Sequence, residues 1–505
     1  MKTYSLLFLF ALMLAQKPYA NMIDSGVVVE DLPSFSLNSL GTTTVFSSDI
    51  WQTSEEGVLF DLIDSIGTQK LTPASKRALT LLLTQDSTGY KGSNNQTDLF
   101  LLKRLNALQR MGSFNEALNL INQIPQKNLS EDIIKIKINL LLALGNLEEA
   151  TKLTDDYSLG SYADKTRINI FLEKEEKNKA ILSYEIYREN SENPVNDPFY
   201  KLADTVLLEL DNPLEKETAI LPEHTFLFAR LKEKISDYPH LTDGIKKVLI
   251  NLPTTPIETR IQFAEQLNLT AEEFSKIYNL PLLNLKIDKN HLKRTDIYQK
   301  IINSQNPDEQ AKLLKNFIDL SKQDKIFLNV APIILTHLNA LIAQPAYIDL
   351  AFDAVQIYIL NNNLEKANEW YQLLSKSPAD NNQKQRLFLI PGLQLLGYGL
   401  PKETDSLIAH FCPNPNESDC SSFWKKMPSV FFEEITAPKP LAQTIIPFEY
   451  VKEENAPKKG ENLIRAILDL NNPNISDKKT ILSFINTTAP QIITRELKQE
   501  DVIYQ

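Results

Sequence analysis

Glycine is scarce in this sequence, with 14 residues among 505, where an average chain has about 7%. Phosphate-cradling loops, nucleophile elbows and tight β-hairpins depend on glycine, because their backbones adopt conformations that a side chain disfavours. The sequence contains no G-x-S-x-G, no phosphate-binding loop motif and no H-E-x-x-H. We therefore expect no cofactor and none of the enzyme folds that these motifs mark.

Histidine is also scarce, and none of the five histidines has the spacing of a metal ligand. We expect each to be an ordinary surface or core side chain: His224, His240, His291, His337 and His410. Adjacent carboxylates, as at 155–156 and 272–273, point in different directions on a helix and do not form an acid–base pair. The sequence predicts no catalytic, cofactor-binding or metal-binding residue, and so no enzyme.

Basic residues are fewer than acidic ones. The chain has 53 lysines and arginines and 64 aspartates and glutamates, which gives a formal net charge of −11. An acidic protein repels phosphate backbones and anionic membrane surfaces. We expect no nucleic-acid partner.

Cysteine occurs only twice, at Cys412 and Cys420, in the segment CPNPNESDC. An oxidising compartment would allow a disulfide around this small proline-rich loop, with a stabilisation of about 2–3 kcal/mol in the chain-entropy model. Two free thiols remain the main alternative, so the oxidation state is open. A redox pair or metal clip is disfavoured, because the spacing is not C-x-x-C and His410 alone does not complete a zinc site.

Long apolar runs are missing except at the N-terminus, where residues 6–15 read LLFLFALMLA after Lys2. This run is shorter than the roughly 20 residues of a membrane-spanning helix and is typical of a signal peptide. We expect residues 1–20 to be removed after Ala20, with Ala15 as the alternative, leaving a periplasmic or secreted protein without a membrane span. A buried N-terminal helix or a retained anchor is the competing interpretation.

The remaining chain is predicted to be mostly helical. Residues 21–47 have the valine and threonine runs of an extended segment, and residues 48–436 show helical periodicity. Residues 437–460 hold four prolines and indicate an irregular strap or linker. Residues 461–505 are predicted to form the C-terminal helices.

An internal repeat lies within the helical part. Residues 111–117 (MGSFNEA) align with residues 144–150 (LGNLEEA), 33 positions on, and eroded copies follow at 176–180 and 362–371. Each copy breaks one helix and opens the next with an acidic residue and then alanine, whose small side chain permits close helix packing. This pattern resembles the tetratricopeptide-like superfamily, whose unit is a helix–turn–helix of about 34 residues. The resemblance implies an all-α fold, a right-handed α-solenoid of helical hairpins.

A second resemblance covers most of the length. Residues 28–32 (VVEDL), 39–41 (SLG) and 49–52 (DIWQ) occur in that order, and an Ala-Glu pair at 264–265 precedes a helix that ends in Tyr278. The order is similar to that of predicted exported helical proteins of α-proteobacteria, often labelled antifreeze-type polyproteins. Ice binding needs flat, repeated threonine arrays, and this chain has one triplet at 42–44. The resemblance implies no catalytic residue.

Tryptophan and its neighbours supply the candidate partner anchors, because aromatic residues dominate binding hot spots. Phe423 and Trp424 follow the cysteine pair, whereas Trp370 lies on an apolar stripe and is predicted to be core; Trp51 is a further candidate. The sequence favours a non-enzymatic scaffold that binds an envelope protein or peptide in a protein–protein interaction. A peptidoglycan lyase-like enzyme and a purely structural envelope protein are the alternatives, and the oligomeric state stays open.

Overall fold

The computed structural model describes residues 40–411 and 459–504, apart from gaps at 53, 87–89, 92–93, 192–196, 213, 232–234, 284, 400–403, 473–474 and 476–477. Across these residues the protein is all-α, as predicted: helices are joined by turns, and the β-structure is a single bridge between Thr43 and Gln85. No helix of this part of the chain has both the length and the apolar character needed to cross a membrane.

The first helices follow a segment that packs into the core through Leu40 and Phe46. They are α2 (Glu56–Ser65), α3 (Pro73–Leu83) and α4 (Asn94–Met111). The start of α3 is fixed locally, because the Thr72 side chain accepts a hydrogen bond from the Ser75 N–H and proline occupies the first helical position.

A run of helix pairs comes next: α5 (Phe114–Ile121), α6 (Glu131–Ala143), α7 (Leu147–Asp156), α8 (Ser161–Glu173) and α9 (Lys177–Asn190). Ser130 caps α6, because its side chain accepts a hydrogen bond from the Ile133 N–H. Helix α5 ends at Ile121, and Pro125 precedes a short 3-10 turn, η2 (Gln126–Asn128).

The middle of the chain has shorter helices. They are α10 (Pro198–Leu207), η4 (Pro222–His224), α11 (Thr225–Phe228), η5 (Ile235–Asp237), α12 (Asp243–Asn251), α13 (Ile257–Ala264) and α14 (Ala271–Tyr278).

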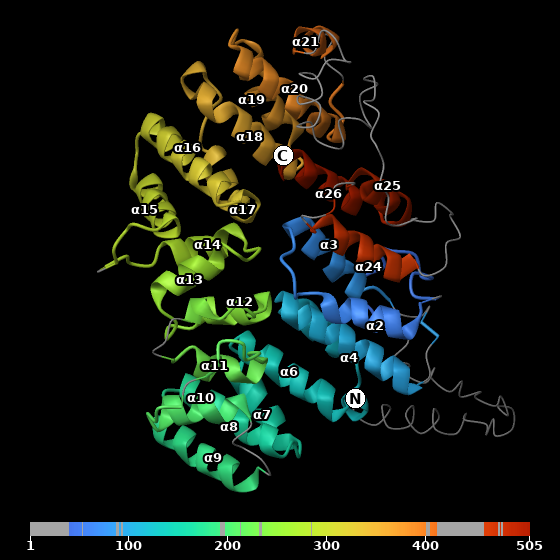
Figure 1. The fold of residues 1–505 in the computed structure, drawn as a ribbon, viewed down its shortest axis with the longest axis vertical. Coiled ribbons are helices and arrows are strands. Elements are labelled where there is room, and N and C mark those ends of the chain that lie inside the picture. The colour runs from blue at the N-terminus through green and yellow to red at the C-terminus, as the bar shows by residue number, and fades with distance from the viewer. Residues whose placement is uncertain are drawn as a thin grey trace, which may run out of the picture. The chain divides into compact units, whose positions relative to one another are not determined.

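The later helices are α15 (Asn290–Asn303), α16 (Pro307–Gln323), α17 (Phe327–Leu338), η6 (Pro345–Tyr347), α18 (Ile348–Leu360), α19 (Leu364–Ser375), α20 (Asp380–Leu395) and α21 (Thr404–Phe411). After the segment outside the described residues come α24 (Lys459–Leu470), α25 (Lys478–Thr488) and α26 (Gln491–Tyr504). Figure 1 shows these helices in chain order, with each hairpin beside the next.

One helix-ending turn occurs six times among the described residues: Gly397 forms one copy after α20, and the other five lead directly into the next helix. In these five, the first or second residue beyond the helix has positive φ: Gly112, Gly145, Glu175, Lys325 and Asn362. In each copy the next N–H donates to the carbonyl five residues before it, at 2.8–3.0 Å, which is the Schellman geometry that ends a helix. Five residues beyond the positive-φ position lies a fully buried small or branched side chain: Ala117, Ala150, Ala180, Val330 and Ala367.

Four of these turns fall on the repeat copies seen in the sequence, and the fifth joins α16 to α17. The sequence pattern missed that copy because Lys325 replaces glycine or asparagine and Val330 replaces alanine. The turn geometry is therefore kept where the sequence signature has been lost.

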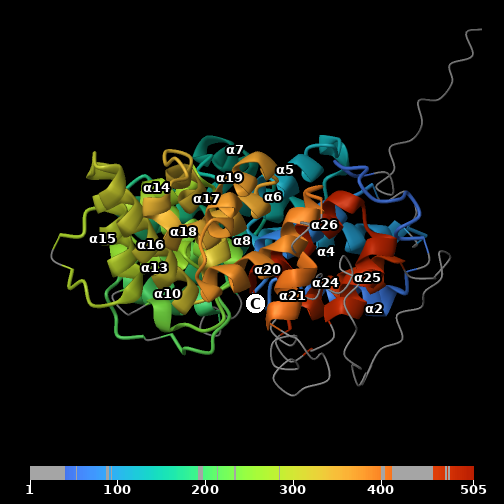
Figure 2. The same ribbon diagram turned by 90° about the horizontal axis from the view of Figure 1, so that it is seen from above.

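The C-terminal helices connect the beginning of the helix series with its late hairpins. Helix α24 packs on α2 and α3, and α26 packs on α3, α18 and α20; Figure 2 shows α26 beside α20 from above. The Thr72 N–H donates to Asn471 at 2.8 Å, and the Ala74 N–H donates to Glu500 at 2.8 Å. On its other side, α26 donates from Gln499 to Asn362 at 3.0 Å.

Close backbone approach is required where α24 meets the start of the chain. The Gly460 N–H donates to the Ile50 carbonyl at 2.9 Å. A Cβ at Gly460 would lie 2.6 Å from the indole ring of Trp51, which is fully buried and also meets Phe100 edge-on at 5.3 Å. Trp51, a candidate partner anchor in the sequence, is thus a core residue of this junction.

Candidate functional site

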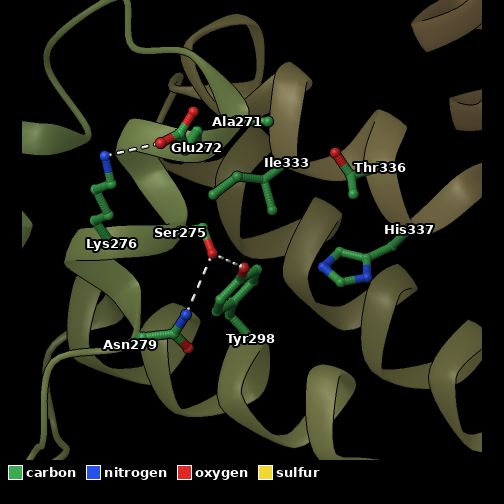
Figure 3. A pocket seen from close by; sticks show the side chains of 9 residues that line it. All are labelled: Ala271, Glu272, Ser275, Lys276, Asn279, Tyr298, Ile333, Thr336 and His337. Carbon is green, nitrogen blue, oxygen red and sulfur yellow. Dashed lines mark hydrogen bonds and ion pairs between the residues drawn. The ribbon is translucent and has the colours of Figure 1, made fainter.

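An open groove of about 340 Å³ lies between α14, α15 and α17. Figure 3 shows helix α14 forming one wall, with Thr336 and His337 of α17 opposite it and Tyr298 of α15 below. The groove is lined by nine residues: Ala271, Glu272, Ser275, Lys276, Asn279, Tyr298, Ile333, Thr336 and His337.

The α14 wall is positioned by a capping box. The Glu273 N–H donates to the Thr270 hydroxyl at 3.2 Å, and the Thr270 N–H donates to the Glu273 carboxylate at 2.8 Å. These reciprocal bonds fix the first turn of the helix. With the start fixed, residues 272, 275, 276 and 279 follow at helical spacing on the face that lines the groove.

A hydroxyl network crosses the floor of the groove. The Tyr298 hydroxyl donates to the Ser275 hydroxyl at 2.9 Å, and the Asn279 amide donates to the same oxygen at 3.2 Å. Tyr298 is 5% exposed, so little of its apolar ring is open to the groove, and its hydroxyl is already paired with Ser275. The floor can therefore pack against an apolar side chain without leaving a buried polar group unpaired.

His337 meets the Tyr298 ring edge-on, with ring centroids 5.4 Å apart. Burial lowers the pKa of His337, so the imidazole is neutral at pH 7. Beside it, Ile333 is buried and contributes apolar surface. This wall combines neutral aromatic and aliphatic surface with the exposed hydroxyl of Thr336.

A buried ion network lies behind the groove and holds its helices together. The Arg294 guanidinium of α15 donates to Glu265 at 2.8 and 2.5 Å and to Asp324 at 2.6 Å. The Tyr278 hydroxyl, at the end of α14, donates to the same Glu265 at 2.7 Å. Burial alone lowers the pKa of Arg294, but its bonds to Glu265 and its attraction to the two carboxylates raise it overall.

This network links two residues of the mid-chain motif by which the sequence resembles the exported helical proteins. Glu265 of the Ala-Glu pair and Tyr278 at the end of the following helix are hydrogen-bonded to each other and buried. The spacing of the motif therefore has a structural explanation, which is the attachment of α14 to the turn that follows α13.

The polar groups of the groove are largely paired with one another. The Ser275 hydroxyl is hydrogen-bonded to Tyr298 and Asn279 rather than to His337. The one carboxylate that lines the groove, Glu272, is paired with Lys276 at 2.8 Å, and this hydrogen bond lowers the pKa of Glu272. Glu272 is thus ionised and a poor general acid. Across the described residues, no group of three histidine, cysteine or acidic side chains could hold a metal ion.

Exposed aliphatic side chains follow two of the groove helices in the chain. Leu283, four residues after Asn279, is 78% exposed, and Ile342, five residues after His337, is 81% exposed. Ile287, in the same connection as Leu283, is also exposed. Single exposed aliphatic side chains are common on protein surfaces, and none of these three lines the groove.

A second hollow lies between α16 and α18 and is more highly charged. Its lining includes Asp308, Lys312, Lys315 and Asp349, and the Tyr347 hydroxyl donates to Asp308 at 2.8 Å. The first groove offers more neutral aromatic surface, so it is the better candidate for partner binding.

The structure does not describe the site residues expected from the sequence. Cys412, Cys420, Phe423 and Trp424 fall outside the described residues, as does the predicted strap of residues 437–460 up to residue 458, whereas residues 459 and 460 already belong to α24. Trp370 is fully buried, as its apolar stripe predicted.

The groove itself was missed because its lining spans residues 271–337 on three helices. The strongest local signal was the leucine-rich connection after Asn279, which reads LPLLNLKI.

No family model matches the chain, and no curated protein shows significant sequence similarity to it.

Proposed function

We propose that this protein is an exported, non-enzymatic helical-repeat scaffold that binds an extended segment of a cell-envelope protein or peptide. The groove between α14, α15 and α17 carries this proposal, because it joins neutral aromatic surface to hydrogen-bonding groups on a rigid support. Its walls supply Tyr298, His337 and Ile333 for apolar side chains, and Asn279 and Thr336 for a peptide backbone.

The recurrent turn supports a tetratricopeptide-like architecture, a right-handed α-solenoid over residues 48–436. Five turns share one backbone geometry and one buried position, and stacked helical hairpins build extended surfaces that bind peptides. The proposed location is the periplasm or the exterior, after removal of a signal peptide at residues 1–20. No observation favours a lyase activity, since the one carboxylate of the groove is committed to an ion pair.

Blocking the groove tests the proposal. Thr336 is exposed on the α17 wall, and Thr487 on α25 is an exposed threonine away from the groove in sequence and in element contacts. We expect cross-linked envelope partners of the wild type to be lost with Thr336→Trp and kept with Thr487→Trp, as measured by mass spectrometry. Equal recovery of the same partners by both variants would contradict the proposal.

A further inference from the structure

Three lysines gather where the segment before α3, helix α3 itself and the start of α12 come together. The Lys76 ammonium of α3 lies 3.3 Å from the Asp243 carboxylate, at the first position of α12. Lys70 and Lys246 act on the same carboxylate, and the charges of Lys70 and Lys76 reach Lys246. Figure 1 shows the end of α12 beside α4 and near α3.

The backbone fixes this meeting point. Helix α12 packs on α4, and a Cβ at Gly244 would lie 2.0 Å from the Gln109 carbonyl oxygen. The turn that follows α4 is tied to α3 by the Thr80 and Ser113 hydroxyls, 3.0 Å apart, and α4 itself packs on α3. The lysines are therefore carried by elements that are in direct contact.

Positive charge is in excess at this point. Lys70 and Lys246 have no carboxylate within ion-pair distance among the described residues, and Asp243 pairs with Lys76. Burial lowers the pKa of Lys246, with the charges of Lys70 and Lys76 adding to the effect and Asp243 opposing it. Two further charges act on Lys76 in opposite directions, since Glu116 raises its pKa and Lys247 lowers it. Three cations and one close anion leave about two unneutralised charges in a chain of net charge −11.

The neighbouring Lys247 has a different role. Its ammonium lies 3.7 Å from Glu273, and its stem would meet a Cβ at Gly112 at 3.3 Å. Lys247 thus covers the end of α4 and pairs with Glu273 at the start of α14, although its charge also reaches Lys76.

We propose that Lys70, Lys76 and Lys246 form a binding site for a phosphate-type oxyanion with two negative charges. Lysine ammonium groups are point charges on separate stems, and they suit a compact tetrahedral anion better than a planar carboxylate, which arginine binds in bidentate fashion. The N-terminal end of α12 adds its positive helix dipole on the same side. An anion here offsets the mutual repulsion of the lysines.

Titration calorimetry of the full-length protein with inorganic phosphate, against chloride at matched ionic strength, tests the site. We expect one phosphate per chain and at least a tenfold weaker affinity for Lys246→Met, which keeps the apolar stem. Lys293→Met, at an exposed position of α15, should bind as the wild type does. If Lys246→Met does not fold, Lys70→Met, at an exposed position before α3, is used in its place and should lose affinity to the same extent.

Vesicles of phosphatidylcholine with and without phosphatidylglycerol identify the source of the phosphate group. Binding to free phosphate without binding to either vesicle assigns a soluble ligand, which the acidic net charge favours. If the protein binds the anionic vesicle, and Lys246→Met weakens that binding as well, the ligand is a lipid headgroup. Absence of phosphate binding by the wild type, or an equal loss in Lys293→Met, overturns the proposal.

Discussion

The recurrent hairpin turns and the C-terminal junction are held by opposite kinds of contact. In each turn the defining hydrogen bond joins residues five positions apart, as from Ser113 to Leu108. At the junction, the bond from Thr72 to Asn471 spans 399 residues and the bond from Ala74 to Glu500 spans 426. The turns are held by backbone hydrogen bonds in a geometry that recurs, whereas the junction is held by side-chain contacts that occur once.

The largest effect is expected within the hairpins that support the groove. Arg294→Met would leave the buried Glu265 carboxylate without its cation, which costs about 3–5 kcal/mol. Chemical denaturation should show this loss, and hydrogen exchange should rise first in α14 and α15. Lys293→Met, at the adjacent exposed position, should change stability little. A loss under 1 kcal/mol in Arg294→Met would show that the network is not a support.

The second-largest effect on stability is expected at the junction and depends on pH. Burial raises the pKa of Glu500 from 4.5 to about 7, although Thr72 and the Ala74 N–H act in the opposite direction. The folded protein therefore keeps a proton that the unfolded chain has lost. This stabilisation is complete below pH 4.5 and is lost as the pH rises to about 7, by up to about 3 kcal/mol.

Glu500→Gln should remove this dependence, because the amide stays neutral. Its free energy of unfolding should match the wild type near pH 4.5 and exceed it increasingly toward pH 7. Glu365→Gln, an exposed position on α19, should give a difference from the wild type that stays flat over the same range. A flat difference for Glu500→Gln as well would mean that Glu500 is not buried at the junction.

A steric change tests the other contact of the junction. Gly460→Ala places a Cβ 2.6 Å from the Trp51 ring and 2.8 Å from the Ile50 carbonyl, so we expect a loss of about 1–3 kcal/mol. Hydrogen exchange should rise in α24 and α3 before it rises in α18 and α19. Gly57→Ala, within α2 and with open space around its Cα, should instead stabilise by about 0.5–1 kcal/mol.

The smallest effect tests the turn that the sequence pattern missed. Lys325 is exposed and has a φ of 55°, a conformation that costs an L-residue about 1 kcal/mol. Lys325→Gly should therefore raise the melting temperature, whereas Lys293→Gly, inside α15, should lower it by a similar free energy. A lower melting temperature for both variants would contradict the assignment of the turn between α16 and α17 to the recurrent helix-ending turns.

Local features of the fold were predictable from the sequence for a physical reason. Thr72, Ser130 and Thr270 cap their helices through hydrogen bonds to N–H groups three residues away, and such bonds need no tertiary context. The hairpin turns at Gly112 and Gly145 were equally predictable from the sequence. The copy at Lys325 was not, because packing holds it in a conformation that its own residue type disfavours.

The junction and the groove were not predictable in this way. In α26 the consecutive residues Lys498, Gln499, Glu500 and Asp501 are all buried, although four polar residues in a row normally indicate a solvent-exposed face. The groove depends on Tyr298, His337 and Ser275, whose proximity follows from stacking of helices that are distant in sequence. No periodicity within one helix contains that information.

Site-specific photo-cross-linking in the envelope tests the proposed function most directly. With a photoreactive residue at position 336, on the α17 wall, the account predicts a discrete adduct with one partner protein or peptide. Position 487 on α25 should give none, and Arg294→Met should weaken the adduct at 336 by loosening the groove. Equal labelling from both positions, or labelling at 487 alone, would contradict the claim that this groove binds the partner.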